Sequence, residues 1–131
     1  MKVMKFGGTS VGSPQRMKEV VKIFCPAAGE QAFVVLSAMS GTTNNLVEIS
    51  DYLYKNNPEA ASTVINQLEQ KYFAHVDELY AARDYRDKTT RFLQDEFKYL
   101  RSFTKDAPTF SSVQEKIILA QGEIISTNMV T

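Results

Sequence analysis

The N-terminal sequence KFGGTSVG (residues 5–12) places a lysine, three glycines and two hydroxyl side chains within eight positions. Glycines let the backbone approach a ligand closely, and a helix N-terminus just beyond them would offer free N–H groups to an anion. Lys5 would lie at a strand end, where a parallel sheet presents its ligands. The combination suits phosphate binding, although it matches neither a Walker A sequence nor G-x-G-x-x-G. Spacing alone favours the alternative, a tight strand-to-helix turn with a solvent-facing lysine.

A second polar stretch, SAMSGTTNN (residues 37–45), follows an apolar segment and precedes a helical pattern. Its hydroxyl and amide side chains belong to Ser37, Ser40, Thr42, Thr43, Asn44 and Asn45. Neighbouring parallel strands end at the same edge of a sheet, so we expect this stretch to form one crevice with residues 5–12. The alternative is helix capping, and we expect either Thr42 or Thr43 to cap the next helix.

The third candidate is Glu123 in AQGEIIST (residues 120–127). A carboxylate within the most hydrophobic helical segment is costly unless it is paired or faces a polar cavity. Pattern alone favours a surface glutamate on the one polar stripe of that helix. Cys25 and His75 have no spacing that supports a nucleophile–base pair or a metal cluster, so we interpret both as structural or surface residues.

The elements that must position these residues begin with a βαβ unit. Residues 2–6 predict a strand that ends at the glycine pair, and the Ser-Pro pair at 13–14 predicts the start of a helix. We expect the proline and glycine within 26–29 to end that helix. The apolar run 32–39 predicts a strand buried on both faces of a parallel sheet, reached by a right-handed crossover.

From Thr42 onward the apolar spacing predicts one helix after another. We expect one helix to end near 56–58, a long one to begin near Glu59, and residues 106–108 to separate a third from the last. The last pattern is apolar nearly all round, which predicts a buried helix. The predicted fold class is therefore α/β: a short parallel sheet from the N-terminal βαβ unit with a large helical subdomain.

Composition limits the function classes. The 131 residues suit one domain, and fifteen basic residues balance fifteen acidic ones, so no net field favours nucleic acid or an anionic membrane. No signal peptide or membrane span is expected, and the single cysteine fits a reducing compartment, the cytoplasm. Two strands make an incomplete sheet, and the last helical pattern runs to Thr131 without a stop signal. We therefore expect this chain to be the front part of a longer protein.

In three stretches the sequence resembles the aspartokinases of the amino acid kinase superfamily. KFGGTSVG, then VVLSAMSGTTN about thirty residues on, then QGEIIST about eighty residues later agree with that family in order, spacing and wording. The resemblance implies a partial amino-acid kinase fold and ATP-dependent phosphorylation of L-aspartate to 4-phospho-L-aspartate, the first step of lysine, threonine and methionine biosynthesis. The alternatives are another kinase of the superfamily or a helical piece without catalysis of its own.

The same resemblance implies the site residues. Lys5 would be the catalytic lysine on the ATP phosphates, and the phosphate-binding loop would comprise Gly7, Gly8, Thr9 and Ser10. The aspartate-binding residues would be Ser37, Thr43 and Glu123. Because like charges repel, we expect Glu123 to face the aspartate ammonium.

The resemblance also implies the ligands and the domain organisation. These are ATP, with Mg²⁺ held mainly by its phosphates and by no protein metal ligand, and aspartate. No nucleic-acid or membrane partner is implied, and the parent protein would be a homo-oligomer. Residues 1–131 would be the N-terminal portion of the catalytic domain, without the nucleotide-binding half and the ACT domains, and we expect this fragment alone to be inactive.

Overall fold

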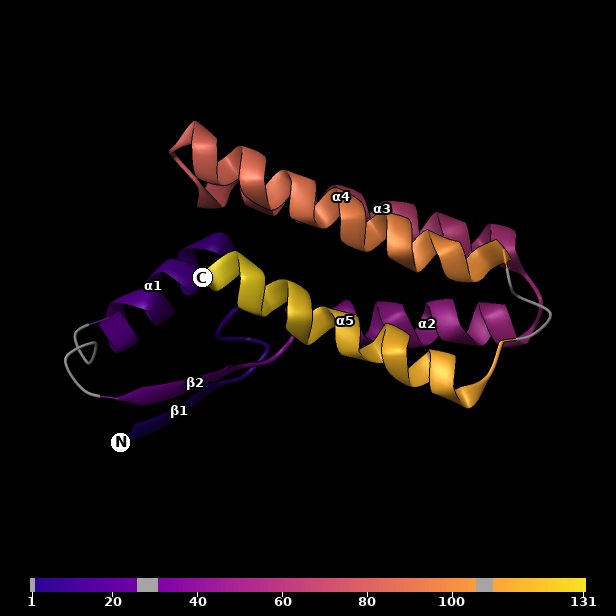
Figure 1. Ribbon diagram of the computed structural model, residues 1–131, viewed down its shortest axis with the longest axis horizontal. Coiled ribbons are helices and arrows are strands. Elements are labelled where there is room, and N and C mark those ends of the chain that lie inside the picture. The colour runs from indigo at the N-terminus through magenta and orange to yellow at the C-terminus, as the bar shows by residue number, and fades with distance from the viewer. Residues whose placement is uncertain (1, 26–30, 106–109) are drawn as a thin grey trace.

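The computed structural model describes residues 2–25, 31–105 and 110–131 (Figure 1). In chain order the elements are β1 (Lys2–Phe6), α1 (Pro14–Phe24), β2 (Ala32–Leu36), α2 (Thr42–Tyr54), α3 (Pro58–Leu79), α4 (Arg83–Lys105) and α5 (Ser112–Val130). A short sheet lies at one end of the molecule, and the long helices extend away from it (Figure 1). The predicted α/β class, with a small parallel sheet and a large helical part, is confirmed.

The strands β1 and β2 pair in parallel, with a register that runs from Lys2 opposite Ala32 to Phe6 opposite Leu36. The helix α1 connects them and begins as predicted, because the Ser13 side chain accepts a hydrogen bond from the Arg16 N–H at 3.2 Å. Pro14 occupies the first helical position. The predicted end of this helix, at 26–29, lies outside the described residues.

The prediction of a strand buried on both faces is wrong for β2. Side chains alternate between the faces of a sheet, so Val3, Phe33 and Val35 share one face, and they are 69%, 61% and 50% exposed. No described element covers that face, whereas α1 and α5 cover the other. The strand also ends at Leu36, three positions earlier than predicted, because the buried Ala38 and Met39 belong to the following loop.

The four helices after the sheet share one elongated core. The helices α3 and α4 lie side by side, and α2 packs against both α3 and α5 (Figure 1). The largest side chains of this core that are completely buried belong to Tyr72 and Phe97, whose ring centroids lie 6.0 Å apart. These helices form because each carries an apolar stripe at helical spacing, which is buried only when the four pack together.

The helix α5 begins at a capping box, in which Ser111 and Gln114 each bind the other's backbone N–H. The predicted separator before it, residues 106–108, lies outside the described residues. The prediction that this helix is buried nearly all round is wrong: Ile118, Ile125 and Met129 are buried, but Val113, Ile117 and Ile124 are exposed, because the other described elements cover only one face of α5. None of the described helices is both long enough and apolar enough to cross a membrane.

Candidate functional site

Two loops follow the two strands, and they are in direct contact. We call residues 7–12 the first loop and residues 37–41 the second loop. The Ser37 N–H donates to the carbonyl of Phe6 at 3.0 Å, which ties the second loop to the end of β1. A Cβ on Gly8 would lie 2.9 Å from the Ala38 carbonyl oxygen, and one on Gly12 would lie 3.0 Å from the Ser40 hydroxyl oxygen. The expectation that the two loops lie side by side is confirmed.

The first loop is a compact turn with one open side. Its backbone is folded by hydrogen bonds from the Ser10 N–H to the Gly7 carbonyl (3.0 Å) and from the Gly12 N–H to the Thr9 carbonyl (3.3 Å). The Arg16 guanidinium, from the first turn of α1, donates to the Thr9 carbonyl at 2.8 Å. A Cβ on Gly7 would meet nothing within 4 Å, so space is open beside that residue.

Lys5 lies at the end of β1, opposite Val35, on the exposed face of the sheet. Its side chain is exposed, and within the described part of the chain its ammonium has no hydrogen-bonding or ion-pairing partner. The ammonium is therefore available to an anion that approaches the first loop.

The second loop leads into α2 through Gly41. This residue has a φ of 83°, in the left-handed region that favours glycine, and it is the N-cap of α2 without a side-chain hydrogen bond. The prediction that Thr42 or Thr43 caps this helix is therefore wrong. The Thr42 hydroxyl is buried and forms a 2.8 Å hydrogen bond with the hydroxyl of Tyr72 instead, while Thr43 is exposed in the first turn, where backbone N–H groups lack helical partners.

The middle of α5 packs closely against the second loop. A Cβ on Gly122 would lie 2.7 Å from the Ala38 Cβ and 3.2 Å from the Thr42 Cγ2, so only glycine permits this approach. Glu123 follows directly and is exposed, as the pattern favoured. Its charge acts on Tyr72: burial raises the pKa of that phenol to about 12, the Thr42 hydrogen bond opposes the rise, and Glu123 adds to it.

Sequence reasoning missed the side chains that hold these loops. Lys71, in the middle of α3, donates from Nζ to the Ser40 carbonyl at 3.1 Å. Tyr72 and Arg16 were not among the predicted site residues. Lys71 gives no signal in the sequence because its partner is a backbone carbonyl 31 positions away.

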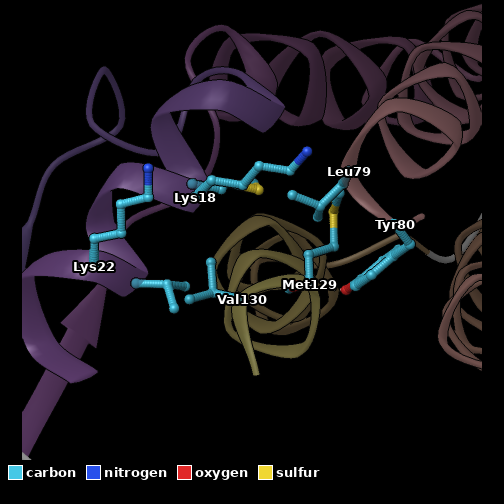
Figure 2. A pocket seen from close by; sticks show the side chains of 8 residues that line it. Lys18, Lys22, Leu79, Tyr80, Met129 and Val130 are labelled. Carbon is cyan, nitrogen blue, oxygen red and sulfur yellow. Dashed lines mark hydrogen bonds between the residues drawn. The ribbon is translucent and has the colours of Figure 1, made fainter. Parts of the chain in front are cut away.

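A cavity of about 380 Å³ lies away from these loops, between α1 and the C-terminal ends of α3 and α5 (Figure 2). It contains none of the predicted site residues, and its lining is mainly apolar, apart from Lys18, Lys22 and Tyr80. A smaller cavity of about 260 Å³ reaches Ser10 and Arg16 at the first loop. We place the candidate site at the two loops because the glycines and donors meet there.

The remaining candidates stay outside the site, as expected. Cys25 is exposed at the end of α1, and His75 is partly buried in α3, where burial and then Lys71 lower its pKa while Glu78 opposes them. Among the described residues, no group of three or more His, Cys, Asp or Glu side chains could hold a metal ion.

The sequence is similar to those of known kinases. The sequence model of the amino acid kinase family matches residues 1–131. The chain is 28% identical over 135 residues to the bifunctional aspartokinase/homoserine dehydrogenase of Haemophilus influenzae, covering 98% of this chain and 16% of that protein. It is 55% identical over 51 residues to an aspartate kinase of Pseudomonas fluorescens, covering 37% of this chain and 12% of that protein.

A solved structure matches the whole fold. The crystal structure of E. coli aspartokinase III in complex with aspartate and ADP superposes with a TM-score of 0.75 at 26% identity, covering 99% of this chain and 28% of that one. The expected partial amino-acid kinase fold is confirmed by this match. The chain spans only a minor part of the length of each of these relatives.

Proposed function

The chain belongs to the amino acid kinase family, and on that premise we propose that it is the N-terminal portion of the catalytic domain of an aspartokinase. The proposed reaction transfers the γ-phosphoryl group of ATP to the side-chain carboxylate of L-aspartate. A carboxylate oxygen forms a bond to the γ-phosphorus, the bond to the β,γ-bridging oxygen breaks, and ADP leaves. The product, 4-phospho-L-aspartate, is an acyl phosphate.

One observation carries this proposal: three stretches that are distant in the sequence meet at one edge of the sheet. Gly8 and Gly12 pack against the second loop, and Gly122 packs against Ala38 of the same loop. Glu123 follows Gly122 in α5, and its charge acts on Tyr72, whose hydroxyl forms a hydrogen bond with Thr42 at the start of α2. A phosphate-binding turn and an amino-acid pocket in contact are what direct phosphoryl transfer between two small molecules requires.

On the ATP side, the main task is to neutralise and align negative charge, because a carboxylate must attack a phosphoryl group. We assign Lys5 to the charge on the bridging and transferred oxygens. Gly7 and Gly8 would donate backbone N–H groups to the phosphates, with Thr9 and Ser10 completing the loop. Fixed donors of this kind lower the barrier because they do not reorganise during the reaction.

On the aspartate side, Ser37 and Thr43 would orient the substrate by hydrogen bonds, and Glu123 would bind its ammonium. Ser37 is the first residue of the second loop, and Thr43 lies in the first turn of α2, whose positive end favours a carboxylate. A hydroxyl group can donate or accept, so these two residues suit a substrate that carries both charges.

Mg²⁺ enters the proposal through ATP, whose phosphates and bound water would hold it. When bound, it would reduce the negative charge of the triphosphate, and we route no step through a protein-bound metal. We also propose a cytoplasmic, homo-oligomeric parent protein with an early role in lysine, threonine and methionine biosynthesis.

The direct test is to trap the acyl phosphate. The full-length protein is incubated with ATP, Mg²⁺ and hydroxylamine, with aspartate as the acceptor and glutamate as the matched control. We expect hydroxamate from aspartate and none above background from glutamate. Hydroxamate from glutamate alone would assign another carboxylate kinase of the family, and none from either would exclude an acyl-phosphate product. Residues 1–131 alone are expected to give none.

A further inference from the structure

Two successive side chains of α3 contact the turn that joins the second loop to α2. The Lys71 ammonium donates to the Ser40 carbonyl at 3.1 Å, and the Tyr72 hydroxyl forms a 2.8 Å hydrogen bond with Thr42. The two contacts differ in burial, because Ser40 is exposed whereas Thr42 and Tyr72 are completely buried. The residues between the contact points, Ser40 to Thr42, form the turn that leads into α2.

This turn is closed by a 3.0 Å hydrogen bond from the Thr42 N–H to the Met39 carbonyl, but it has no side-chain cap of its own. Gly41 is in the left-handed region and offers no side chain to cap α2. A Cβ on Gly41 would lie 3.8 Å from the Lys71 ammonium, so the lysine lies against the turn itself as well as against the preceding carbonyl. A hydrogen bond from a charged donor is stronger than one between neutral groups, and it fixes the direction of the carbonyl.

We expect the hydrogen bond between Lys71 and Ser40 to affect the order of the loop more than the stability of the fold. Ser40 and Gly41 are exposed, so water can bind the Ser40 carbonyl when the ammonium is removed, and little folding free energy is lost. Tyr72 differs because it is completely buried, and its loss would open the core. Lys71 is therefore the residue through which the order of the turn can be changed separately from stability.

We propose that Lys71 is a positioning residue for the aspartate-binding side of the site. Its ammonium fixes the Ser40–Gly41 turn, and Ser37 and Thr43, which flank that turn, thereby hold their hydroxyls at a constant separation. Lys71 acts through the loop backbone. This inference rests on the proposed function and assigns a role to the helical segment after the second loop, which the sequence motifs leave without one.

The test compares three variants of the full-length protein. Lys71→Met keeps the length of the side chain and removes the donor, Lys71→Arg restores a charged donor, and Lys98→Met removes an exposed lysine of α4 as the control. Loss of one charge-assisted hydrogen bond predicts a rise of about tenfold in the KM for aspartate in Lys71→Met. The KM for ATP and the melting temperature should stay close to those of the parent, Lys71→Arg should recover most of the affinity, and Lys98→Met should change neither KM.

A second readout does not depend on catalysis. Hydrogen exchange of the backbone amides of residues 41–44 should accelerate in Lys71→Met, while exchange in the middle of α4 stays unchanged. Unchanged exchange at 41–44, or equal rises in the KM values for aspartate and ATP, would overturn the positioning role. If the parent protein forms no hydroxamate from aspartate, the proposed function fails, and exchange alone then decides whether Lys71 orders the turn.

Discussion

The proposed role of Lys5 can be tested without breaking another interaction, because its ammonium has no partner in the described part of the chain. We predict that Lys5→Ala lowers kcat of the full-length enzyme by about a hundredfold, the usual effect of removing one pre-placed donor from a transition state. Because the side chain is exposed, the melting temperature should not change. Steady-state kinetics measures kcat of Lys5→Ala, and the control is Lys55→Ala, which removes an exposed lysine after α2. Near-normal turnover would remove Lys5 from the mechanism.

The role proposed for Glu123 concerns aspartate and not ATP. We predict that Glu123→Gln raises the KM for aspartate far more than the KM for ATP, because the neutral amide no longer attracts an ammonium. The control is Glu48→Gln, which removes an exposed carboxylate of α2. Equal changes in both KM values would contradict the assignment of Glu123 to the substrate ammonium.

His75 makes stability depend on pH. Its pKa is lowered from 6.5, mainly by burial and then by the nearby Lys71, against a smaller opposing effect of Glu78. At pH values between 6.5 and the lower pKa of His75 in the folded state, the unfolded chain binds a proton on His75 that the folded chain does not. The free energy of unfolding is therefore unaffected by the protonation of His75 above this pH range, and it decreases as the pH falls through the range. Melting temperatures across this range should fall less steeply in His75→Gln, and identical slopes would contradict the prediction.

At the scale of elements, the crossing of α5 over the second loop depends on the absence of a side chain. We predict that Gly122→Ala destabilises the protein by about 1–3 kcal/mol, as overpacking of a close contact does, because the new Cβ would lie 2.7 Å from that of Ala38. The double variant Ala38→Gly/Gly122→Ala relieves the closest contact and should recover part of the loss. Urea unfolding of the three proteins measures this, and a single variant as stable as the parent would show that the elements move apart freely.

Local signals made most of the elements predictable from sequence. The start of α1 follows from Ser13 and Pro14 because a cap and a first-turn proline act within a few residues. The apolar spacing predicts α2 from about Thr42, but the predicted cap is wrong, since Gly41 is the N-cap and the Thr42 hydroxyl binds Tyr72, 30 positions away. The loops could be expected to meet because parallel strands end together. Lys71 could not be found, because its contact with the Ser40 carbonyl exists only after α3 packs beside α2.

At the scale of the whole molecule, the sheet has one covered face and one exposed face. Val3, Phe33 and Val35 place apolar surface on the exposed face. We predict that the isolated chain of residues 1–131 self-associates as its concentration rises, and that Phe33→Thr/Val35→Thr reduces this while keeping β-branched residues in the strand. Sedimentation velocity of both proteins measures it, with Val47→Thr on α2 as the control. If the unsubstituted chain of residues 1–131 stays monomeric at all concentrations, the prediction is contradicted.

The contact between Gly122 and Ala38 also sets an order of events during synthesis. The two residues belong to segments that leave the ribosome far apart in time, with all of α2, α3 and α4 made between them. The packing of α5 against the second loop therefore cannot form until α5 has emerged and docked, even though both glycine-containing loops are already made. Until then, nascent chains carry an uncovered patch around Ala38 and Leu46, which makes this stage a point at which a chaperone would engage the protein.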